Sequence, residues 1–295
     1  MPCENVNELM ARAQRGGYAL GYFESWNLES LQGTLDAAEA TRSPVILGFN
    51  GEFLSQPGRV AQERLELYAS LGRAACTAAT VPCGLIFNEC ADSDWLRRAT
   101  TLGFNLIMPA DPEAPFDEYT RSVASLVQYA HGYGVSVEAE VGVLPCGMSG
   151  EIHGSGEATD PETAERFVEA TGVDLLAVSV GNVHIMIDGT QGLDLERLAE
   201  IRRRVSVPLV LHGGSGIASE PLKQAIRLGV AKVNYGTGLK QRYLSAVRAA
   251  LDSGQTNPHE LLGMGGAGDA MVAGRLAVRD AVLERMEFLG CCGKA

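Results

Sequence analysis

Carboxylate and imidazole groups stand at the ends of several apolar runs in this chain. The run "LIFNEC" (85–90) carries Glu89 near its end, and His184 and His212 follow or end two later runs. Two histidines and a carboxylate from separate strands can supply three ligands to a divalent metal and leave positions open for substrate. We therefore expect a metal site made by Glu89, His184 and His212, with Glu140 as a candidate fourth ligand. The alternative is that both histidines are structural and Glu89 pairs with an arginine.

Two glycine-rich segments follow the last two apolar runs. They read "LHGGSGI" (211–217) and "NYGTGLK" (234–240). Glycines let backbone N–H groups approach an anion, and Ser215 and Thr237 add hydroxyl groups. The pattern predicts a phosphate-binding cradle, although glycine-rich turns are also common as simple loops.

The elements that must position these groups are eight short β-rich runs that alternate with helix-like stretches. The runs span 18–23, 44–49, 83–88, 106–110, 136–141, 175–180, 208–213 and 232–237. Near-continuous apolar strands covered by helices indicate a parallel sheet, and eight repeats favour a closed barrel. We expect an α/β protein with one (β/α)8 TIM-barrel domain over 1–295. A doubly wound open sheet is the alternative.

The carboxyl ends of barrel strands build the active site in this architecture. Glu24, Asn50, Asn88 and Asp111 follow predicted strands, in addition to the candidate metal ligands. We therefore expect these groups to converge on one mouth. The glycine-rich segment 263–274 lies far from these ends, and we expect a loop or a mobile flap there.

The composition excludes several classes of partner. The net charge of −12 is spread along the chain, which argues against nucleic acid and anionic membranes. No apolar stretch is long enough for a membrane span, and the first residues lack the layout of a signal peptide. The seven cysteines have irregular spacing and form no C-x-x-C pair. We expect a soluble cytoplasmic protein without a disulfide framework.

Other chemistries have weaker support. The sequence "GGSG" does not satisfy the G-x-S-x-G pattern of a hydrolase nucleophile. Cys90 could be a nucleophile, but a neighbouring glutamate does not lower a thiol pKa as a cation does, and a buried small residue is the commoner fate. No G-x-G-x-x-G opens a helix after a strand, so a dinucleotide is not expected.

The chain resembles the class II, metal-dependent aldolases that act on fructose or tagatose bisphosphate. The resemblance runs nearly end to end, through "NLESLQGTLDAAEATRSPVIL", "YGVSVEAEVG", "DPETAERFVEATGVDLLAVSVGNVH", "VPLVLHGGSGI", "AKVNYGTGLK" and "LERMEFLGCCGKA". It implies a (β/α)8 barrel that forms dimers or tetramers. It also implies a zinc ion that polarises the carbonyl of dihydroxyacetone phosphate while an aspartate moves protons.

The resemblance breaks at the catalytic positions. Where the family carries histidine-leucine-aspartate-histidine, this chain has isoleucine, phenylalanine, Asn88 and Glu89. Asn88 thus replaces the catalytic aspartate and cannot exchange a proton at useful pH. Glu89 replaces a zinc-binding histidine, whereas His184 and His212 match the other two ligands. Glu140 matches a glutamate near the metal.

Further departures lie in the loops. Met148 takes the place of a proton-donating glutamate, and Ile185 and Asp188 take the places of glycine and lysine. Pro109 replaces an aspartate, and Glu24 replaces a substrate-binding asparagine. The remaining pattern gives these candidate ligands for substrate and phosphate: Asn50, Gly181, Gly213, Ser215, Asn234, Gly236 and Thr237.

From these residues we expect a retuned lyase site. Glu89 and the two histidines would bind Zn²⁺, or else Mn²⁺ or Fe²⁺. Asn88 would hydrogen-bond the substrate, and Glu24 or Glu140, with Asp111 third, would transfer protons. The expected reaction makes or breaks a carbon-carbon bond beside the carbonyl of a ketose, ketose phosphate or sugar acid other than fructose 1,6-bisphosphate. The alternatives are an isomerase or epimerase acting through an enediolate, and a non-catalytic sugar-phosphate-binding homologue.

Overall fold

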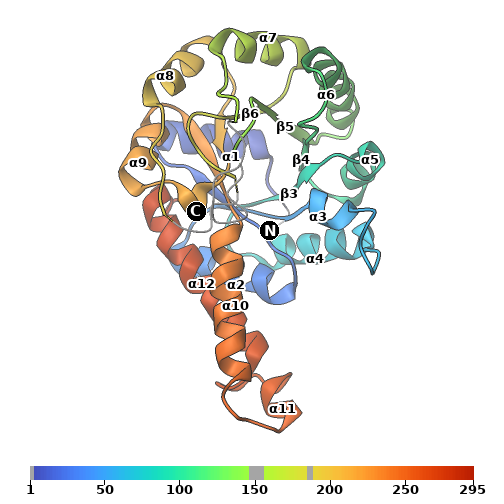
Figure 1. Cartoon of the computed structure of the whole chain (residues 1–295), viewed down its shortest axis with the longest axis vertical. Helices are drawn as coiled ribbons and strands as arrows, with labels where there is room; N and C mark the ends of the chain where they lie inside the picture. The colour runs from blue at the N-terminus through green and yellow to red at the C-terminus, as the bar shows by residue number, and fades with distance from the viewer. Residues whose placement is uncertain (1–2, 146–155, 185–188) are drawn as a thin grey trace.

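Eight parallel strands close into a barrel in their order along the chain (Figure 1). The computed structural model describes residues 3–145, 156–184 and 189–295. This confirms the (β/α)8 barrel and rules out the open sheet. The strands are β1 Leu20–Phe23, β2 Val45–Asn50, β3 Cys83–Cys90, β4 Leu106–Pro109, β5 Ser136–Val141, β6 Leu175–Val178, β7 Leu209–Leu211 and β8 Val230–Tyr235.

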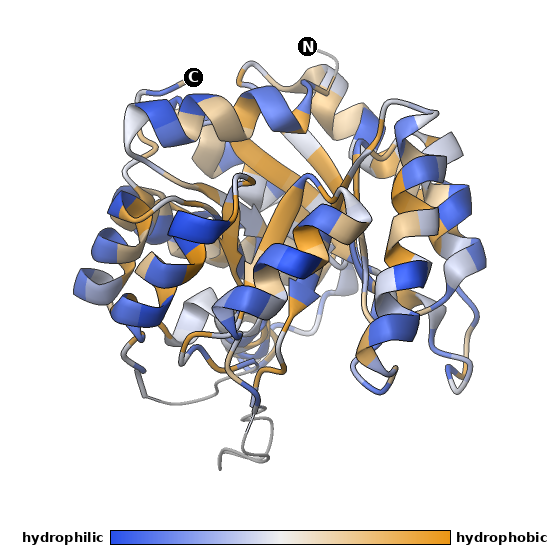
Figure 2. Cartoon of the chain, turned by 90° about the horizontal axis from the view of Figure 1, so that it is seen from above, coloured by the Kyte–Doolittle hydropathy of each residue, from blue (hydrophilic) through white to orange (hydrophobic). Residues whose placement is uncertain are grey.

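Helices surround this barrel and expose their polar faces. Figure 2 shows apolar strands inside and alternating apolar and polar faces on the surrounding helices. None of the helices in the described ranges is long and apolar enough to cross a membrane. The helices are α1 Val6–Gly16, α2 Leu28–Thr41, α3 Gly51–Ser55, α4 Leu65–Ala78, α5 Ser93–Leu102, α6 Phe116–His131, α7 Pro161–Thr171, α8 Leu195–Arg204, the 3-10 helix η1 Gly214–Gly216, α9 Ser219–Arg227, α10 Thr237–Leu251, α11 Pro258–Leu261 and α12 Ala270–Leu289.

Three strands end at residues other than the predicted ones, all at the mouth of the barrel. β8 ends at Tyr235, and Gly236 and Thr237 belong to the start of α10. β7 stops at Leu211, so that His212 lies in the loop before η1. β3 continues to Cys90, two residues beyond its predicted end. Apolar patterning marks the strands but does not fix their last residue, because the final positions carry polar groups that serve the site.

The segment 263–274 is only partly a loop. Its last five residues belong to α12, because Asp269 caps that helix by accepting hydrogen bonds from the N–H groups of Met271 and Val272. The same carboxylate accepts from Gly263 N–H at 2.8 Å and Gly265 N–H at 3.0 Å. One buried aspartate therefore organises the turn. Together α10, α11 and the start of α12 project from the barrel as an arm (Figure 1).

Aromatic side chains fill the space between the barrel and its helices. Phe167 of α7 is fully buried, stacks on Tyr119 with ring centroids 5.7 Å apart, and meets Phe116 at 6.0 Å. Such rings bury large apolar areas, and their removal leaves a cavity that the barrel cannot collapse to fill. This packing fixes α6 and α7 on the barrel wall.

We expect Phe167→Ala to lower the free energy of unfolding by about 3–5 kcal/mol, because it removes a whole ring from a packed contact. Tyr133→Ala is the matched control, since Tyr133 is 56% exposed and should cost less than about 0.5 kcal/mol. Urea unfolding followed by circular dichroism measures both. Equal costs for the two variants would contradict this account of the packing.

Candidate active site

An irregularity in β3 brings two consecutive polar side chains to the same side of the barrel wall. Successive side chains of a regular strand point to opposite faces. Here the pairing with β4 shifts register between Phe87 and Cys90, and Glu89 has φ 51°. A bulge of this kind re-aims side chains, and a positive φ is costly for a residue with a Cβ. Asn88 and Glu89 consequently both line the pocket at the barrel mouth.

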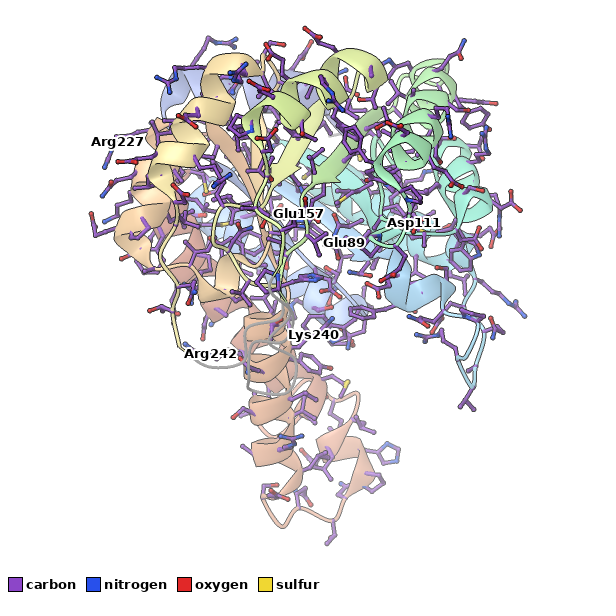
Figure 3. The ribbon with its side chains drawn as sticks, turned by 45° about the horizontal axis from the view of Figure 1, so that its top comes forward. Glu89, Asp111, Glu157, Arg227, Lys240 and Arg242 are labelled. Carbon is purple, nitrogen blue, oxygen red and sulfur yellow. The ribbon has the colours of Figure 1, made fainter. Side chains whose placement is uncertain are left out.

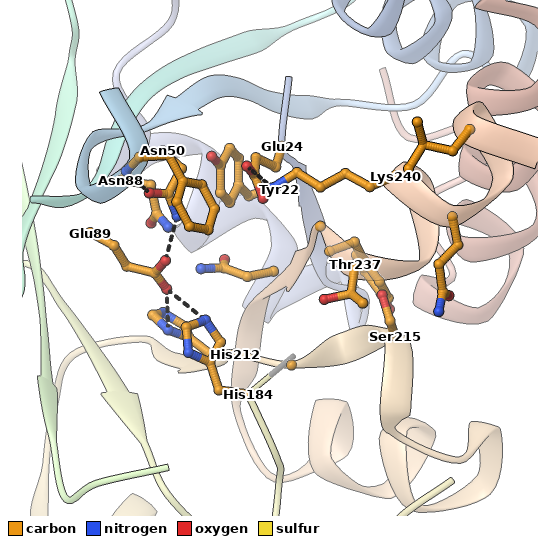
Figure 4. A pocket seen from close by; sticks show the side chains of 17 residues that line it. Tyr22, Glu24, Asn50, Asn88, Glu89, His184, His212, Ser215, Thr237 and Lys240 are labelled. Atoms are coloured by element: carbon orange, nitrogen blue, oxygen red, sulfur yellow. Dashed lines mark hydrogen bonds and ion pairs between the residues drawn. The ribbon is translucent and has the colours of Figure 1, made fainter. Parts of the chain in front are cut away.

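The carboxylate of Glu89 contacts both histidines. Its Oε1 lies 3.0 Å from Nδ1 of His212 and 3.7 Å from Nε2 of His184 (Figure 4). Its Oε2 accepts a 2.7 Å hydrogen bond from the Asn50 amide, whose own oxygen accepts from Phe53 N–H at the start of α3. Three separate strand ends therefore hold the carboxylate, and Asn50 positions Glu89.

The charges in this group stabilise one another. Burial opposes ionisation of Glu89, but the hydrogen bond and charge of His212 lower its pKa to about 2. Burial likewise opposes protonation of His212, but Glu140, Glu138 and Glu89 raise its pKa to about 10. Both ring nitrogens face carboxylates, which an imidazole satisfies fully only when both carry protons. Without a bound metal, His212 is thus an imidazolium between carboxylates.

A buried ion pair lies beneath the histidine. Glu138 and Lys232 are both fully buried, with Nζ 2.8 Å from Oε2, and Glu138 Oε1 lies 3.1 Å from Nε2 of His212. Burial alone would lower the pKa of Lys232 and raise that of Glu138. Lys232 and His212 together lower the pKa of Glu138 below its ordinary value. Lys232 also donates to Asn234 Oδ1 at 2.6 Å and so orients that amide.

The loops after β6 and β7 approach closely because of one glycine and one asparagine. Gly213 has φ 68°, and a Cβ there would lie 2.0 Å from the carbonyl oxygen of Val183. The Asn182 side chain donates to the carbonyl oxygen of His212 at 3.1 Å and accepts from Val180 N–H at 2.9 Å. These contacts hold the two histidine-bearing loops together.

The mouth forms a cavity of about 300 Å³. Four buried polar atoms of its lining residues lack a hydrogen-bond partner: Oδ1 of Asn88, Nδ2 of Asn234 and the hydroxyls of Tyr22 and Tyr235. The described residues that line it are Tyr22, Glu24, Asn50, Phe53, Asn88, Glu89, His184, His212, Gly213, Ser215, Asn234, Tyr235, Gly236, Thr237, Lys240, Gln241 and Leu244. Because unpaired buried polar groups are costly, these four are suited to bind a ligand.

The wall opposite Glu89 is formed by β1 and α10. Lys240 of α10 donates to Oε1 of Glu24 at 2.6 Å, and its Nζ lies 4.3 Å from the ring centroid of Phe53. Ser215 accepts from the Gly238 N–H in the first turn of α10 at 3.3 Å. Figure 4 shows this wall across the cavity from Glu89 and the histidines.

Most of the predicted site residues meet at this mouth. Of the substrate and phosphate candidates, only Gly181 is absent from the described residues that line the cavity. Asp111 is exposed and likewise absent from that lining, so its predicted role has no geometric support. Figure 3 shows Asp111 and Glu89 on the barrel and Lys240 where α10 leaves it. Glu140 is also absent from the lining and lies beside His212, with Oε2 4.0 Å from Nδ1. Met148, Ile185 and Asp188 fall outside the described residues.

Cys90 packs against its surroundings. Its side chain is fully buried, and its sulfur lies 3.8 Å from the hydroxyl of Ser55. Burial raises the pKa of the thiol to about 11. A thiol of this kind is largely protonated at neutral pH and is a poor nucleophile.

Sequence reasoning missed several residues of the site, among them Tyr22, Lys232 and Lys240. Lys232 interrupts the apolar run "VAKVNY", and a lysine inside a barrel strand is a signal that a buried carboxylate accompanies it. Tyr22 lies two residues before Glu24, as the period of a strand requires for a shared face. Lys240 had no comparable signal, since its partner comes from the other end of the chain.

The donor set has the chemistry of a metal site. Within the described residues, no three His, Cys, Asp or Glu side chains are already arranged to hold an ion; Glu89 contacts the imidazoles directly instead. Two imidazoles and two carboxylates nevertheless suit a divalent cation. The second carboxylate is that of Glu140, whose Oε2 lies 4.0 Å from Nδ1 of His212. The residues present therefore fit a metal.

The fold and the mouth together define a (β/α)8 barrel whose strands carry a cavity lined by carboxylates, amides and histidines at their carboxyl ends. The model of the class II fructose-bisphosphate aldolase family matches residues 4–294, and the chain belongs to this family. It is thus an aldolase-type lyase by descent, in a family that generally depends on a divalent metal.

Individual relatives agree with the family. The chain is 34% identical to a fructose-bisphosphate aldolase of Geobacillus stearothermophilus over 298 residues, covering 100% of this chain and 99% of the relative. It is similar to the YdjI aldolase of Escherichia coli K12, with 33% identity, TM-score 0.81 and complete coverage of both chains. A fructose-bisphosphate aldolase of Campylobacter jejuni shares the fold at 22% identity and TM-score 0.78, covering 98% of this chain and 95% of that one.

We expect Lys232→Met to lower the free energy of unfolding by about 3–5 kcal/mol, because it leaves Glu138 buried without its main counter-charge. Adding Glu138→Gln should recover part of this loss. The control Lys223→Met removes an exposed pair with Glu220 and should cost less than about 1 kcal/mol. Urea unfolding measures all four proteins, and an unchanged midpoint for Lys232→Met would contradict the buried pair.

Proposed function

We propose that the protein is a metal-dependent aldolase that makes or breaks a carbon-carbon bond beside the carbonyl of a ketose-type substrate. The convergence of Glu89, His184 and His212 at the barrel mouth carries this proposal. Oε1 of Glu89 lies within 3.7 Å of an imidazole nitrogen of each histidine. Burying these charged side chains together is costly, and a sensor protein has little need for them. An enzyme that makes or breaks carbon-carbon bonds does need such groups.

Glu89, His184 and His212 would hold the metal, and Glu140 stands beside them. A divalent cation supplies a Lewis acid that polarises a substrate carbonyl. Zn²⁺ is our first choice, and Mn²⁺ and Fe²⁺ also suit two histidines with a carboxylate. Asn50 keeps Glu89 in place through its 2.7 Å hydrogen bond.

Glu140 is the proposed proton carrier. Asn88 stands where the family has its catalytic aspartate, and an amide does not exchange protons at neutral pH. Burial raises the pKa of Glu140, opposed by the charges of His212 and His184, and its Oε1 has no hydrogen-bond partner. A carboxyl group with a raised pKa is a stronger base than an ordinary one and can both take and return a proton. We therefore assign to Oε1 of Glu140 the proton removed from the substrate.

Neutral groups in the cavity would orient the substrate. Oδ1 of Asn88 can accept from a hydroxyl, and Nδ2 of Asn234 can donate to a hydroxyl or carbonyl oxygen. Lys232 fixes the Asn234 amide so that its donor, and not its acceptor, is left unpaired. A substrate hydroxyl would therefore bind at Asn88 as a donor, and a substrate hydroxyl or carbonyl oxygen would bind at Asn234 as an acceptor.

Glu89→Ala should weaken binding of Zn²⁺ by more than about 100-fold. Mutating a residue that only hydrogen-bonds to a metal ligand already lowers metal affinity by about 10–100-fold, and the loss of a ligand should exceed this. Glu162→Ala is the matched control, since the Glu162 side chain is 76% exposed on α7. Titration calorimetry with Zn²⁺ and Mn²⁺ measures the affinity, and bound metal is quantified after dialysis. Full retention of metal by Glu89→Ala would remove Glu89 from the site.

Glu140→Gln should slow the exchange of carbon-bound hydrogens of dihydroxyacetone with D₂O by about 10²–10⁴, the usual worth of a general base. Nuclear magnetic resonance follows the exchange in the zinc-loaded protein. The zinc affinity of the variant, measured in parallel, should stay within about tenfold of the parent because an amide oxygen remains. Exchange at the parental rate would exclude Glu140 as the proton carrier.

The reaction type has its own test. With dihydroxyacetone and glyceraldehyde, the metal-loaded protein should form a six-carbon ketose, whereas interconversion of sugars without change of carbon count would indicate an isomerase. Cleavage of fructose 1,6-bisphosphate should be slow, because Asn88 cannot act as the base. Turnover of that substrate at an ordinary enzymatic kcat, about 1–10³ s⁻¹, would refute this role of Asn88.

A further inference from the structure

Glu24 lies at the end of β1 in the wall of the cavity and reaches the start of α10. It is 8% exposed, and its backbone N–H donates to the carbonyl oxygen of Tyr235 at 2.9 Å. A Cβ on Gly236 would lie 2.4 Å from Glu24 Oε2, so the carboxylate occupies space that any side chain at position 236 would need. The Glu24 carboxylate therefore packs directly against Gly236, the residue that precedes α10.

The position that Glu24 occupies is one that favours an anion. α10 is 15 residues long, and its N-cap residue, Gly236, has no side chain with which to cap it. Helix N-termini carry partial positive charge and attract carboxylates and phosphates. The N–H groups of Leu239 and Lys240 bond to the carbonyl oxygen of Gly236, and the N–H of Gly238 donates to Ser215. The chain's own groups thus engage most of the first turn.

The lysine of this wall is also engaged. Among the described residues that line the cavity, Lys240 is the only lysine or arginine. Its Nζ lies 2.6 Å from Glu24 Oε1 and over the ring of Phe53. Since a phosphate needs a cation or several free donors, a phosphate at this wall would have to displace Glu24.

The unpaired groups elsewhere in the cavity are neutral. Oδ1 of Asn88, Nδ2 of Asn234 and the hydroxyl of Tyr22 are buried and lack partners. Asn88 and Tyr22 are each 2% exposed, and Asn234 is 7% exposed. The hydroxyl of Tyr235, another lining residue, is also buried without a partner. One acceptor, one donor and two hydroxyls match the hydroxyl and carbonyl groups of a sugar, and none of them compensates a phosphate charge.

We propose that Glu24 is a specificity residue that fills the anion position at the N-terminus of α10, so that the substrate is neutral and hydroxyl-bearing at that end. This inference rests on the proposed aldolase function and names the class of its substrate: a polyhydroxy ketone without phosphate at the α10 wall. The hydroxyl groups of such a compound can bridge Glu24 and Lys240, whereas a phosphate meets the negative charge of Glu24.

Titration of the full-length protein with inorganic phosphate and with dihydroxyacetone phosphate tests this, in the presence of EDTA so that no bound metal contributes. The parent should show no saturable heat in calorimetry. Glu24→Gln should bind both anions at least about tenfold more tightly, because the negative charge beside the helix N-terminus is removed and Lys240 loses its counter-charge. Glu24→Asp keeps the charge and should resemble the parent. Adding Lys240→Met to Glu24→Gln should abolish the gain.

Saturable phosphate binding by the parent, or no gain in Glu24→Gln with native circular dichroism, would overturn the proposal. If Glu24→Gln fails to fold, Glu24→Ala takes its place: it removes the same charge and should bind phosphate at least about tenfold more tightly than the parent, and the absence of that gain would overturn the proposal. These titrations involve no turnover. Failure of the hydrogen-exchange and aldol assays would refute the proposed function, whereas phosphate binding by the parent refutes only this inference.

Discussion

The ion pair between Lys232 and Glu138 in the barrel interior is the constraint on which the site depends. A lysine and a glutamate are costly to bury, and each is tolerated only because the other compensates its charge. Through Glu138 the pair reaches His212, and through His212 it reaches Glu89. The position of the candidate metal ligands is therefore set by charges below the mouth as much as by the strands that carry them.

The backbone at Glu89 shows what this arrangement costs. Glu89, a non-glycine residue, has φ 51°. A backbone conformation of this kind costs about 1–3 kcal/mol and persists only where surrounding contacts hold it. Asn50 and His212 hold the carboxylate from two sides, and the bulge in β3 is the geometry that lets both of them reach it. Strain at this position is consistent with selection for the placement of a functional group.

The mouth has two walls of different character. On one side, imidazoles and carboxylates gather around Glu89, where a cation has the ligands that it prefers. On the other side, Glu24 and Lys240 neutralise each other at the start of α10. Between them lie neutral groups of Asn88, Asn234 and Tyr22 without partners. One cavity therefore has room for both proposals: a metal that polarises the substrate carbonyl on the Glu89 side, and a substrate without phosphate on the α10 side.

The sequence by itself determined the barrel and the ring of strand-end residues, because apolar runs alternating with helices are a local pattern that needs no knowledge of distant contacts. It also placed Glu89, His184 and His212 at one mouth, since all parallel strands of a barrel end on the same side. Only the tertiary structure decided which groups touch. The β3 bulge depends on its pairing with β4, Lys232 meets Glu138 across the barrel interior, and Glu24 meets Lys240, 216 positions away, only once the barrel has closed. Charge pairing acts through space, so these contacts have no periodic trace in the chain.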